Sequence, residues 1–307
     1  MSMGFKVLGV GEVLWDLLPG GPQLGGAPAN FACHAAALGA DAGLVSCVGR
    51  DELGREALRL LGARGLDLSA VSIDAELPTG TVAVVMDSKG HPVFTIAGNT
   101  AWDAVKAGER AMELAAGSDA ICFGSLGQRT AAAGAEIRRL VQATRPEALR
   151  VFDVNLRPPF YTADVITASL ELANVLKLNE TELPVLAGLY QLRGSPEMQL
   201  ETLAGRFGLD VVALTLGAAG SRLFRDGRWT AEPARPVVVK DAVGAGDSFT
   251  AALVAGLLRQ WPTPKLLAAA SEVSAFVCTR AGATPELPQH LIRMFQPADV
   301  PVMISAV

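Results

Sequence analysis

The feature that most constrains the fold is a repeated alternation of short apolar, β-branched runs with Ala- and Leu-rich segments of helical period. The runs that predict strands cover residues near 5–12, 43–48, 119–124, 149–154, 174–178 and 210–216. The segments that predict helices cover residues near 28–38, 52–64, 130–144 and 180–188. Apolar strands that alternate with helices are typical of a mainly parallel sheet with helices on both faces. The sequence therefore predicts an α/β fold.

Two segments break this alternation. TVAVVMD and HPVFTIAG lie on either side of SKG and predict a β-hairpin across residues 80–98. SRLFRDGRWT predicts a second hairpin, with its turn at Asp226 and Gly227. A hairpin cannot be part of a βαβ unit. The first hairpin is therefore either a lid that projects from the sheet or an antiparallel edge of it, and the pattern favours neither.

The composition favours one large globular unit. Half of the 307 residues are apolar, which is enough to bury a sizeable core. The chain has no internal repeat and no long linker, so we expect a single domain over residues 1–307 with a small β appendage. The 26 Lys and Arg against 31 Asp and Glu give a net charge of −5. This balance lacks the basic excess of a general nucleic-acid binder.

Nothing in the sequence predicts a membrane or secretory segment. The apolar runs are shorter than the roughly 18 to 20 residues that cross a bilayer. The first of them is soon interrupted by Glu12 and Asp16, unlike a secretory signal. The four cysteines lie far apart without a CxxC spacing, which favours reduced, buried thiols over a disulfide or zinc framework. We therefore expect a cytoplasmic protein with neither a membrane nor a nucleic-acid partner.

The strongest local motif is DAVGAGDSFTAALVAGLL at residues 241–258, a glycine-rich turn that leads directly into an apolar helix. Gly244 and Gly246 let successive backbone amides converge at a helix N-terminus, which makes a cradle for an anion such as phosphate. Asp247 follows in the first helical turn, where it could accept a proton from an attacking hydroxyl. The alternative is that Asp247 only caps the helix while the glycines only shape the turn. The local pattern alone favours this structural alternative.

A second dense motif, LGGAPANFACHAAALGADAGLVSCVGRDELG, covers residues 24–54. Small residues around Gly26 would let a ligand approach the backbone, and the Asn30 amide suits a pair of sugar hydroxyls. The alternative for Asn30 is an N-cap before a helix. Asp16 follows a predicted strand, where α/β proteins bind ligands, and its alternative is a solvated loop carboxylate. The chain has no GxxxxGK[ST] sequence, which excludes a P-loop.

Taken together, the two motifs resemble the signatures of the ribokinase-like sugar kinases, the PfkB carbohydrate kinase family. The first signature runs from Gly25 through Asn30 to Gly49, and the second from Asp241 to Leu253 around GAGD. KLNETEL and LTLGAAGS, which lie between them, also resemble family motifs. The resemblance thus spans nearly the whole chain. Unlike the local pattern, it favours the functional interpretation of Asp247 over the structural alternative.

The resemblance implies a central parallel sheet and a β-stranded lid formed by about residues 13–27 and 78–101. It implies an ATP-dependent kinase in which Asp247 removes the proton from the sugar hydroxyl. The amides of Gly244, Ala245 and Gly246 would stabilise the transferring phosphoryl group. A homodimer through the exposed lid is compatible with this fold, and so is a monomer.

The resemblance also implies sites for the nucleotide and its cations. Asn179 and Glu182 would order water around the Mg²⁺ of ATP, and the same pair could cap a helix. The ATP site would be formed by Thr215, Gly217, Gly220, Gly246 and Ser271. A monovalent cation, K⁺ in many relatives, would lie near Asp241, Val243, Val277, Arg280, Gly282 and Glu286. Glu286 departs from the family pattern, in which a serine is common.

GEVLWDLLP, FDVNLRPPFY and KLNETEL look more like bacterial fructokinases than like ribokinases or adenosine kinases. The candidate sugar contacts are Asp16, Gly26, Asn30, Asn99, Arg157 and Asp247. Arg157 is ambiguous, because related 2-keto-3-deoxygluconate kinases use such an arginine to bind a substrate carboxylate. It could instead contact phosphate or pair with Asp153.

We therefore expect the substrates in the order D-fructose, which would give fructose 6-phosphate, then 2-keto-3-deoxygluconate, then ribose or a nucleoside. The alternative of another class is a sugar- or nucleotide-binding paralogue that has lost catalysis. The retained Asp247, GAGD turn and NxxE pattern argue against it.

Overall fold

The structure is a computed structural model, and it describes residues 4–86 and 92–296. Nine strands form its main sheet: β1 (Lys6–Val10), β4 (Asp41–Gly49), β5 (Asp67–Asp74), β8 (Ala120–Gly124), β9 (Leu149–Asp153), β10 (Val175–Asn179), β11 (Val211–Thr215), β12 (Ser221–Arg225) and β13 (Arg228–Glu232). They pair in the order β13-β12-β11-β10-β9-β8-β1-β4-β5. From β11 to β5 all neighbouring strands are parallel, which confirms the predicted fold class.

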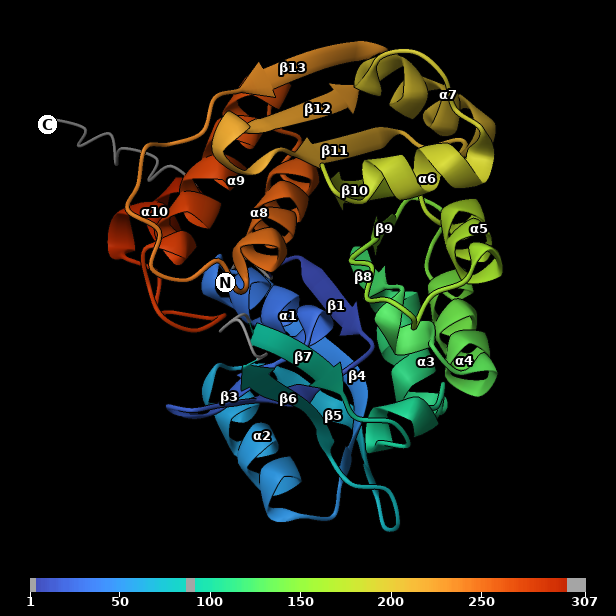
Figure 1. Cartoon of the computed structure of the whole chain (residues 1–307), viewed down its shortest axis with the longest axis vertical. Coiled ribbons are helices and arrows are strands. Elements are labelled where there is room, and N and C mark those ends of the chain that lie inside the picture. The colour runs from blue at the N-terminus through green and yellow to red at the C-terminus, as the bar shows by residue number, and fades with distance from the viewer. Residues whose placement is uncertain (1–3, 87–91, 297–307) are drawn as a thin grey trace, which may run out of the picture.

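Helices cover both faces of this sheet (Figure 1). One face packs against α1 (Ala27–Ala37), α8 (Ala245–Leu258), α9 (Thr263–Cys278) and α10 (Gln289–Met294). The other packs against α3 (Glu109–Gly117), α4 (Ala131–Gln142), α5 (Ala163–Leu172), α6 (Leu183–Tyr190) and α7 (Pro196–Phe207). α2 (Glu52–Ala63) lies beside β4 and α1. None of the helices in the described ranges is long and apolar enough to cross a membrane.

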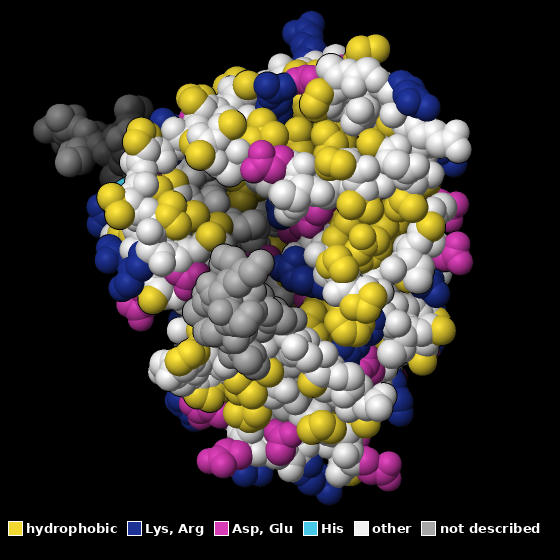
Figure 2. All heavy atoms as spheres, viewed as in Figure 1, with side chains coloured by type: hydrophobic (Ala, Val, Ile, Leu, Met, Phe, Trp, Pro, Cys, Tyr) yellow, Lys and Arg dark blue, Asp and Glu magenta, His cyan; other side chains and the backbone are white. Residues whose placement is uncertain are grey.

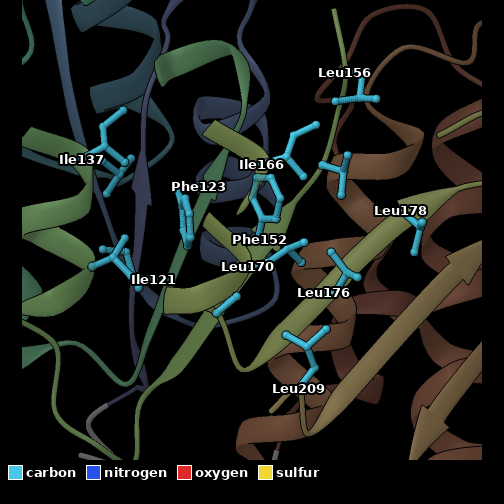
Figure 3. Packing of buried hydrophobic residues seen from close by; sticks show 14 of the residues in the cluster. Ile121, Phe123, Ile137, Phe152, Leu156, Ile166, Leu170, Leu176, Leu178 and Leu209 are labelled. Carbon is cyan, nitrogen blue, oxygen red and sulfur yellow. The ribbon is translucent and has the colours of Figure 1, made fainter. Parts of the chain in front are cut away.

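The core divides into clusters on the two faces because successive strand residues point in opposite directions. On β8, Ile121 and Phe123 face the α3–α7 side, whereas Ala120 and Cys122 face α1 and α8. Figure 3 shows Phe123 beside Phe152 of β9, with their ring centroids 5.5 Å apart. Burying a side chain of this size stabilises the fold by about 1.5–3 kcal/mol.

A second, four-stranded sheet lies apart from the first. It contains β2 (Leu14–Leu18), β3 (Gly21–Gly25), β6 (Gly80–Met86) and β7 (Pro92–Ile96), in the order β3-β2-β6-β7. β6 and β7 are the antiparallel pair predicted as the first hairpin, so that hairpin is not an edge of the main sheet. The antiparallel edge is the second hairpin, β12–β13, whose turn residues Asp226 and Gly227 both have positive φ.

The β6–β7 hairpin of the small sheet is tied to the main body at both of its ends. At one end, Asp51 accepts hydrogen bonds from the Thr79 amide (2.8 Å) and hydroxyl (2.6 Å). At the other end, Arg129 makes a two-armed ion pair with Asp103 in the short helix η1 (Ala101–Ala104), with N–O distances of 2.7 and 2.6 Å. These contacts fix the base of the small sheet, while its strands extend beyond them.

The predicted strands agree with the observed ones to within a few residues, but some elements were not predicted. β5 is half-exposed at the sheet edge, and its sequence DLSAVSID lacks a continuous apolar run. Helices α3, α5, α7, α9 and α10 were also missed in the pattern analysis. The helix expected from residue 180 begins at Leu183, because Asn179 and Glu182 form its cap.

Candidate active site

The candidate site lies where the carboxyl ends of the parallel strands meet the N-terminus of α8. In such sheets, ligands bind beyond the carboxyl edge, at the point where the strand order reverses. Here β1 lies between β8 and β4, so this point falls at the end of β1. Figure 2 shows the surface hollowed near its middle, with acidic and basic side chains in the hollow.

The GAGD turn is the candidate anion cradle. Gly244 is the N-cap of α8 with a φ of 78°, and a Cβ there would lie only 2.1 Å from the Ala283 carbonyl oxygen. The first helical bond, from the Ser248 amide to the Gly244 oxygen, is 2.9 Å long. The amides of Ala245, Gly246 and Asp247 therefore precede the helical ladder, at the positive end of a 14-residue helix. This arrangement suits a phosphate group.

Asp247 lies in the first turn of α8, beside the GAGD turn. It does not cap the helix, since Gly244 does, and its Oδ2 accepts a hydrogen bond of 2.8 Å from Asn30 Nδ2. Burial raises the pKa of Asp247 to about 6, and the nearby charge of Asp153 adds to this rise. The pKa of Asp247 therefore lies above the ordinary value of an aspartate. At pH 7 it is still mostly ionised, but it is a stronger base than a solvated aspartate.

Asn30 and Gly26 belong to the same helix start. The N-cap of α1 is Gly26, with a φ of 108°, and a Cβ on it would meet the Glu12 carbonyl oxygen at 2.4 Å. Asn30 lies inside α1, so the capping alternative for it is wrong. Its amide joins the two signature motifs across 217 positions of the sequence.

A buried polar network that sequence analysis missed lies directly behind the cradle. Lys177 Nζ is 3.0 Å from Asp153 Oδ1, and both side chains are 7% exposed. The Thr250 hydroxyl lies 2.9 Å from Asp153 Oδ2 and 3.0 Å from the Gly246 carbonyl oxygen. A Cβ on Gly246 would lie 2.9 Å from Lys177 Nζ. The available signal was a charged residue at the end of one apolar run, VFD, and another inside the run VLKLN.

Glu12 is a second residue that was missed. It is 2% exposed, its Oε1 accepts the Ala27 amide at 3.3 Å, and its Oε2 has no hydrogen-bond partner among the residues that the structure describes. Burial raises its pKa to about 7, and the charge of Asp247 acts in the same direction. A carboxylate two residues after an apolar strand was the signal for it.

The other predicted sugar contacts differ in their exposure. Asp16 lies within β2, half-buried, with its Oδ2 over Gly25, so it is not a loop carboxylate. Burial raises the pKa of Asp16, and the charge of Arg157 opposes this rise. Arg157 is exposed and donates to the Leu156 carbonyl at 3.0 Å. The suggested pair between Arg157 and Asp153 is wrong, because Asp153 pairs with Lys177. Asn99 is exposed in the turn after β7, with a φ of 52°.

Asn179 and Glu182 form the capping pair. The Glu182 carboxylate is buried and accepts the amides of Leu156 (3.0 Å) and Asn179 (2.8 Å). Asn179 Oδ1 accepts the Glu182 amide at 3.1 Å in return. Burial raises the pKa of Glu182, and the charge of Lys177 lowers it. Since both oxygens already hold amides, this carboxylate fits a water-mediated contact with a cation better than a direct one.

The predicted nucleotide residues gather at the end of β11. Thr215 is its last residue, and Gly217 (φ 52°) and Gly220 (φ 95°) shape the turn into β12. A Cβ on Gly220 would lie 2.1 Å from the Glu232 carbonyl oxygen. Ser271 of α9 lies 3.0 Å from the hydroxyl of Ser221, which follows this turn. The structure thus brings these four residues to one edge, whereas Gly246, the fifth predicted nucleotide residue, lies in the first turn of α8.

The residues predicted for a monovalent cation are only partly brought together. Asp241 accepts the amides of Val243 and Gly282, each at 3.0 Å, and so joins their two loops. The Val277 side chain lies in the core, whereas Arg280 and Glu286 are exposed. Within the described residues, no group of three or more His, Cys, Asp or Glu side chains is placed to hold a metal ion.

The comparisons with known proteins agree with this geometry. The model of the pfkB family carbohydrate kinases matches residues 22–290. The fructokinase of Klebsiella pneumoniae is 32% identical over 93% of this chain and 97% of its own length. The ATP-bound fructokinase of Xylella fastidiosa superposes with a TM-score of 0.83 at 20% identity, over 94% of this chain and 98% of that one. The 2-dehydro-3-deoxygluconokinase of Thermotoga maritima gives a TM-score of 0.82 at 21% identity, over 94% and 98% of the chains.

Proposed function

The chain belongs to the pfkB family of carbohydrate kinases and is a sugar kinase; we propose that its acceptor is the primary hydroxyl of D-fructose, which becomes fructose 6-phosphate. The observation that carries the assignment of roles is the hydrogen bond between Asn30 and Asp247. It brings a candidate sugar-binding amide and a candidate base together beside the candidate anion cradle of α8.

The residues suffice for phosphoryl transfer. Asp247 takes the proton from the sugar hydroxyl, whose oxygen attacks the terminal phosphorus of ATP while ADP leaves. The amides of Gly244, Ala245 and Gly246 stabilise the negative charge on the transferring group. Such reactions depend mainly on positioning and electrostatics. A base with a pKa of about 6 is well suited to work near neutral pH.

The nucleotide would lie along the edge formed by Thr215, Gly217, Gly220 and Ser271. Mg²⁺ would arrive with ATP and neutralise phosphate charge. Glu182 and Asn179 would hold it through water, in keeping with a carboxylate whose oxygens both accept backbone amides.

Fructose is favoured because bacterial fructokinases are among the relatives that are similar over nearly their whole length. Asp16, Gly26, Asn30 and Asn99 would then face the sugar hydroxyls. A second candidate is 2-keto-3-deoxygluconate, which Arg157 supports. This guanidinium acts on the pKa of Asp16 and Asp247, yet its only side-chain hydrogen bond within the described residues is to the carbonyl of Leu156. It is therefore free to bind a substrate carboxylate.

The test is ADP release from ATP over a panel of D-fructose, 2-keto-3-deoxygluconate, ribose and adenosine. We expect the highest kcat/KM with D-fructose.

Asp247→Asn should lower kcat by about 10² to 10⁴. Asp226→Asn is the matched control, since this exposed turn residue lies at the opposite edge of the sheet and should leave kcat unchanged. A highest kcat/KM with 2-keto-3-deoxygluconate would select the second candidate, and near-normal turnover of Asp247→Asn would remove its role as base.

Two further expectations belong to this proposal. K⁺ would bind near the Asp241–Gly282 contact with Val243, Val277, Arg280 and Glu286 around it, and replacing K⁺ by Na⁺ in the assay tests this.

The small sheet would act as the lid over the sugar. Its outer strands β3 and β7 would pair two copies in a homodimer, which light scattering of the purified protein tests.

A further inference from the structure

The buried pair of Lys177 and Asp153 is the feature that the proposed function does not yet explain. Both side chains are almost fully buried and lie on neighbouring strands, β10 and β9, at 3.0 Å. Removing two charges from water costs several kcal/mol for each ion, and a hydrophobic pair of similar size is often as stable. The pair is therefore a poor device for stability alone.

The position of this pair points to the reaction centre. The Lys177 ammonium lies behind Gly246, so close that a Cβ on that residue would be 2.9 Å from Nζ. Gly246 must remain a glycine for this contact, because the ammonium is held in place by Asp153 and cannot move aside freely. On the same side, the Thr250 hydroxyl connects Asp153 to the Gly246 carbonyl. The network thus ends on the backbone of the cradle itself.

We propose that Lys177 and Asp153 are positioning residues for phosphoryl transfer. Together they hold a fixed positive charge behind the Gly246 amide. The charge of Lys177 favours the ionised form of the Asp247 carboxylate, and the charge of Asp153 disfavours it. The proposal rests on the proposed function, since it requires Asp247 to be the base. Neither residue needs to touch substrate, because both act through Gly246 and Asp247.

The electrostatic surroundings of Asp247 support this proposal. Beyond the effect of burial, Asp153 raises the pKa of Asp247 and Lys177 lowers it. The other groups that face Asp247 are Asn30 from α1, Arg157 from the loop after β9, and Glu12 after β1. Arg157 and Asn30 lower its pKa, and Glu12 would raise it when ionised. The charge of Lys177 also acts on Glu182, one of the residues of the candidate cation site.

The test uses the acidic limb of the pH profile of kcat/KM. Lys177→Met should move this limb to higher pH by about one unit, and Asp153→Asn should move it to lower pH by about one unit. The double variant Lys177→Met/Asp153→Asn should return the limb to near its wild-type position. Lys177→Met should also lower kcat about tenfold, since the cradle loses the charge behind it. A merely structural pair would not give shifts of opposite sign.

Several controls keep the test decisive. Glu12 titrates in the same range, so the profiles are repeated in a Glu12→Gln background, which removes the contribution of Glu12 to the acidic limb. Lys177→Met leaves Asp153 buried without its partner and is prone to unfold. If it does, Asp153→Asn becomes the reference for the double variant, which differs from it only by the loss of Lys177. The acidic limb of the double variant should then lie at higher pH than that of Asp153→Asn. Melting temperatures identify the folded variants.

The outcomes separate the two proposals. If Asp247→Asn is nearly inactive but the folded Lys177 and Asp153 variants keep the wild-type limb, or shift it in the same direction, the positioning proposal is overturned and the proposed function survives. If Asp247→Asn is fully active, the limb does not report Asp247, and both the role of Asp247 as base and the positioning proposal fall, whereas the acceptor is still decided by the substrate panel. Opposite shifts together with an inactive Asp247→Asn support both.

Discussion

Two buried ion pairs of similar burial lie in different parts of this molecule. Lys177 and Asp153 are 7% exposed behind the cradle, whereas Arg129 and Asp103 are 5% and 9% exposed at the base of the small sheet. Lys177 makes one hydrogen bond to its partner, and Arg129 makes two. Because a two-armed contact is stronger than a single one, Arg129–Asp103 is the stronger pair by geometry.

The neighbours of the two pairs differ. Arg129 stacks on Trp102, 3.7 Å from its ring centroid, and donates to the Thr100 hydroxyl at 3.1 Å. These contacts hold the chain where it leaves the small sheet. Lys177 instead lies within reach of Asp247 and Glu182, whose pKa values it lowers. Burial alone therefore does not distinguish a structural ion pair from one that acts on the reaction. The distinction comes from the groups that surround each pair.

The largest effect should come from breaking the structural pair. Arg129→Met leaves Asp103 buried without its partner, which should lower the free energy of unfolding by about 3–5 kcal/mol. The acidic limb of the kcat/KM profile should not move, because Asp103 and Arg129 are not among the groups that face Asp247. Urea denaturation and the pH profile measure the two effects.

The double variant Arg129→Met/Asp103→Asn is the control for the Arg129 prediction. Without a buried charge it should recover a large part of the lost stability. A limb that shifts in Arg129→Met as far as in Lys177→Met would contradict the comparison, since burial rather than neighbourhood would then decide the effect.

Much of this architecture could be predicted from the sequence, because strand alternation and the turn at Asp226 and Gly227 are local features. The signature motifs also predicted that Asn30 and Asp247 belong to one site. The Lys177–Asp153 pair could not be predicted in the same way. It depends on β9 lying beside β10 and on α8 docking over both, which are contacts between distant segments. A charged residue within an apolar strand was the only local sign.

A second prediction concerns Glu12, a buried carboxyl near the base but outside either ion pair. Its pKa is raised from 4.5 to about 7, so the folded state binds this proton more tightly than the unfolded state does. The resulting stability is fully present below about pH 4.5 and is lost as the pH rises through 7, a difference of about 3 kcal/mol. Glu12→Gln cannot titrate, so its unfolding free energy should fall less over this range.

Denaturation from pH 4.5 to 7.5 measures the slope for Glu12→Gln. Asp247 contributes a decline of the same sign at lower pH in both proteins, because its pKa is also raised. The exposed residue Glu76 provides the matched control, and Glu76→Gln should keep the wild-type slope. An unchanged slope in Glu12→Gln would mean that Glu12 is solvated in the folded protein.

The smallest effect should come from the threonine beside each pair. Thr250 and Thr100 are both buried, and each places its hydroxyl on an ion pair. Thr250→Val and Thr100→Val remove that hydroxyl at nearly constant volume, and each should lower the unfolding free energy by about 1–2 kcal/mol. Their effects on turnover should differ. Thr250→Val also loses the contact with the Gly246 carbonyl, so its kcat should fall a few-fold, whereas Thr100→Val should keep the wild-type kcat. Equal kcat values in two variants of equal stability would show that the network behind the cradle does not reach the reaction, and the distinction between the two pairs would then be lost.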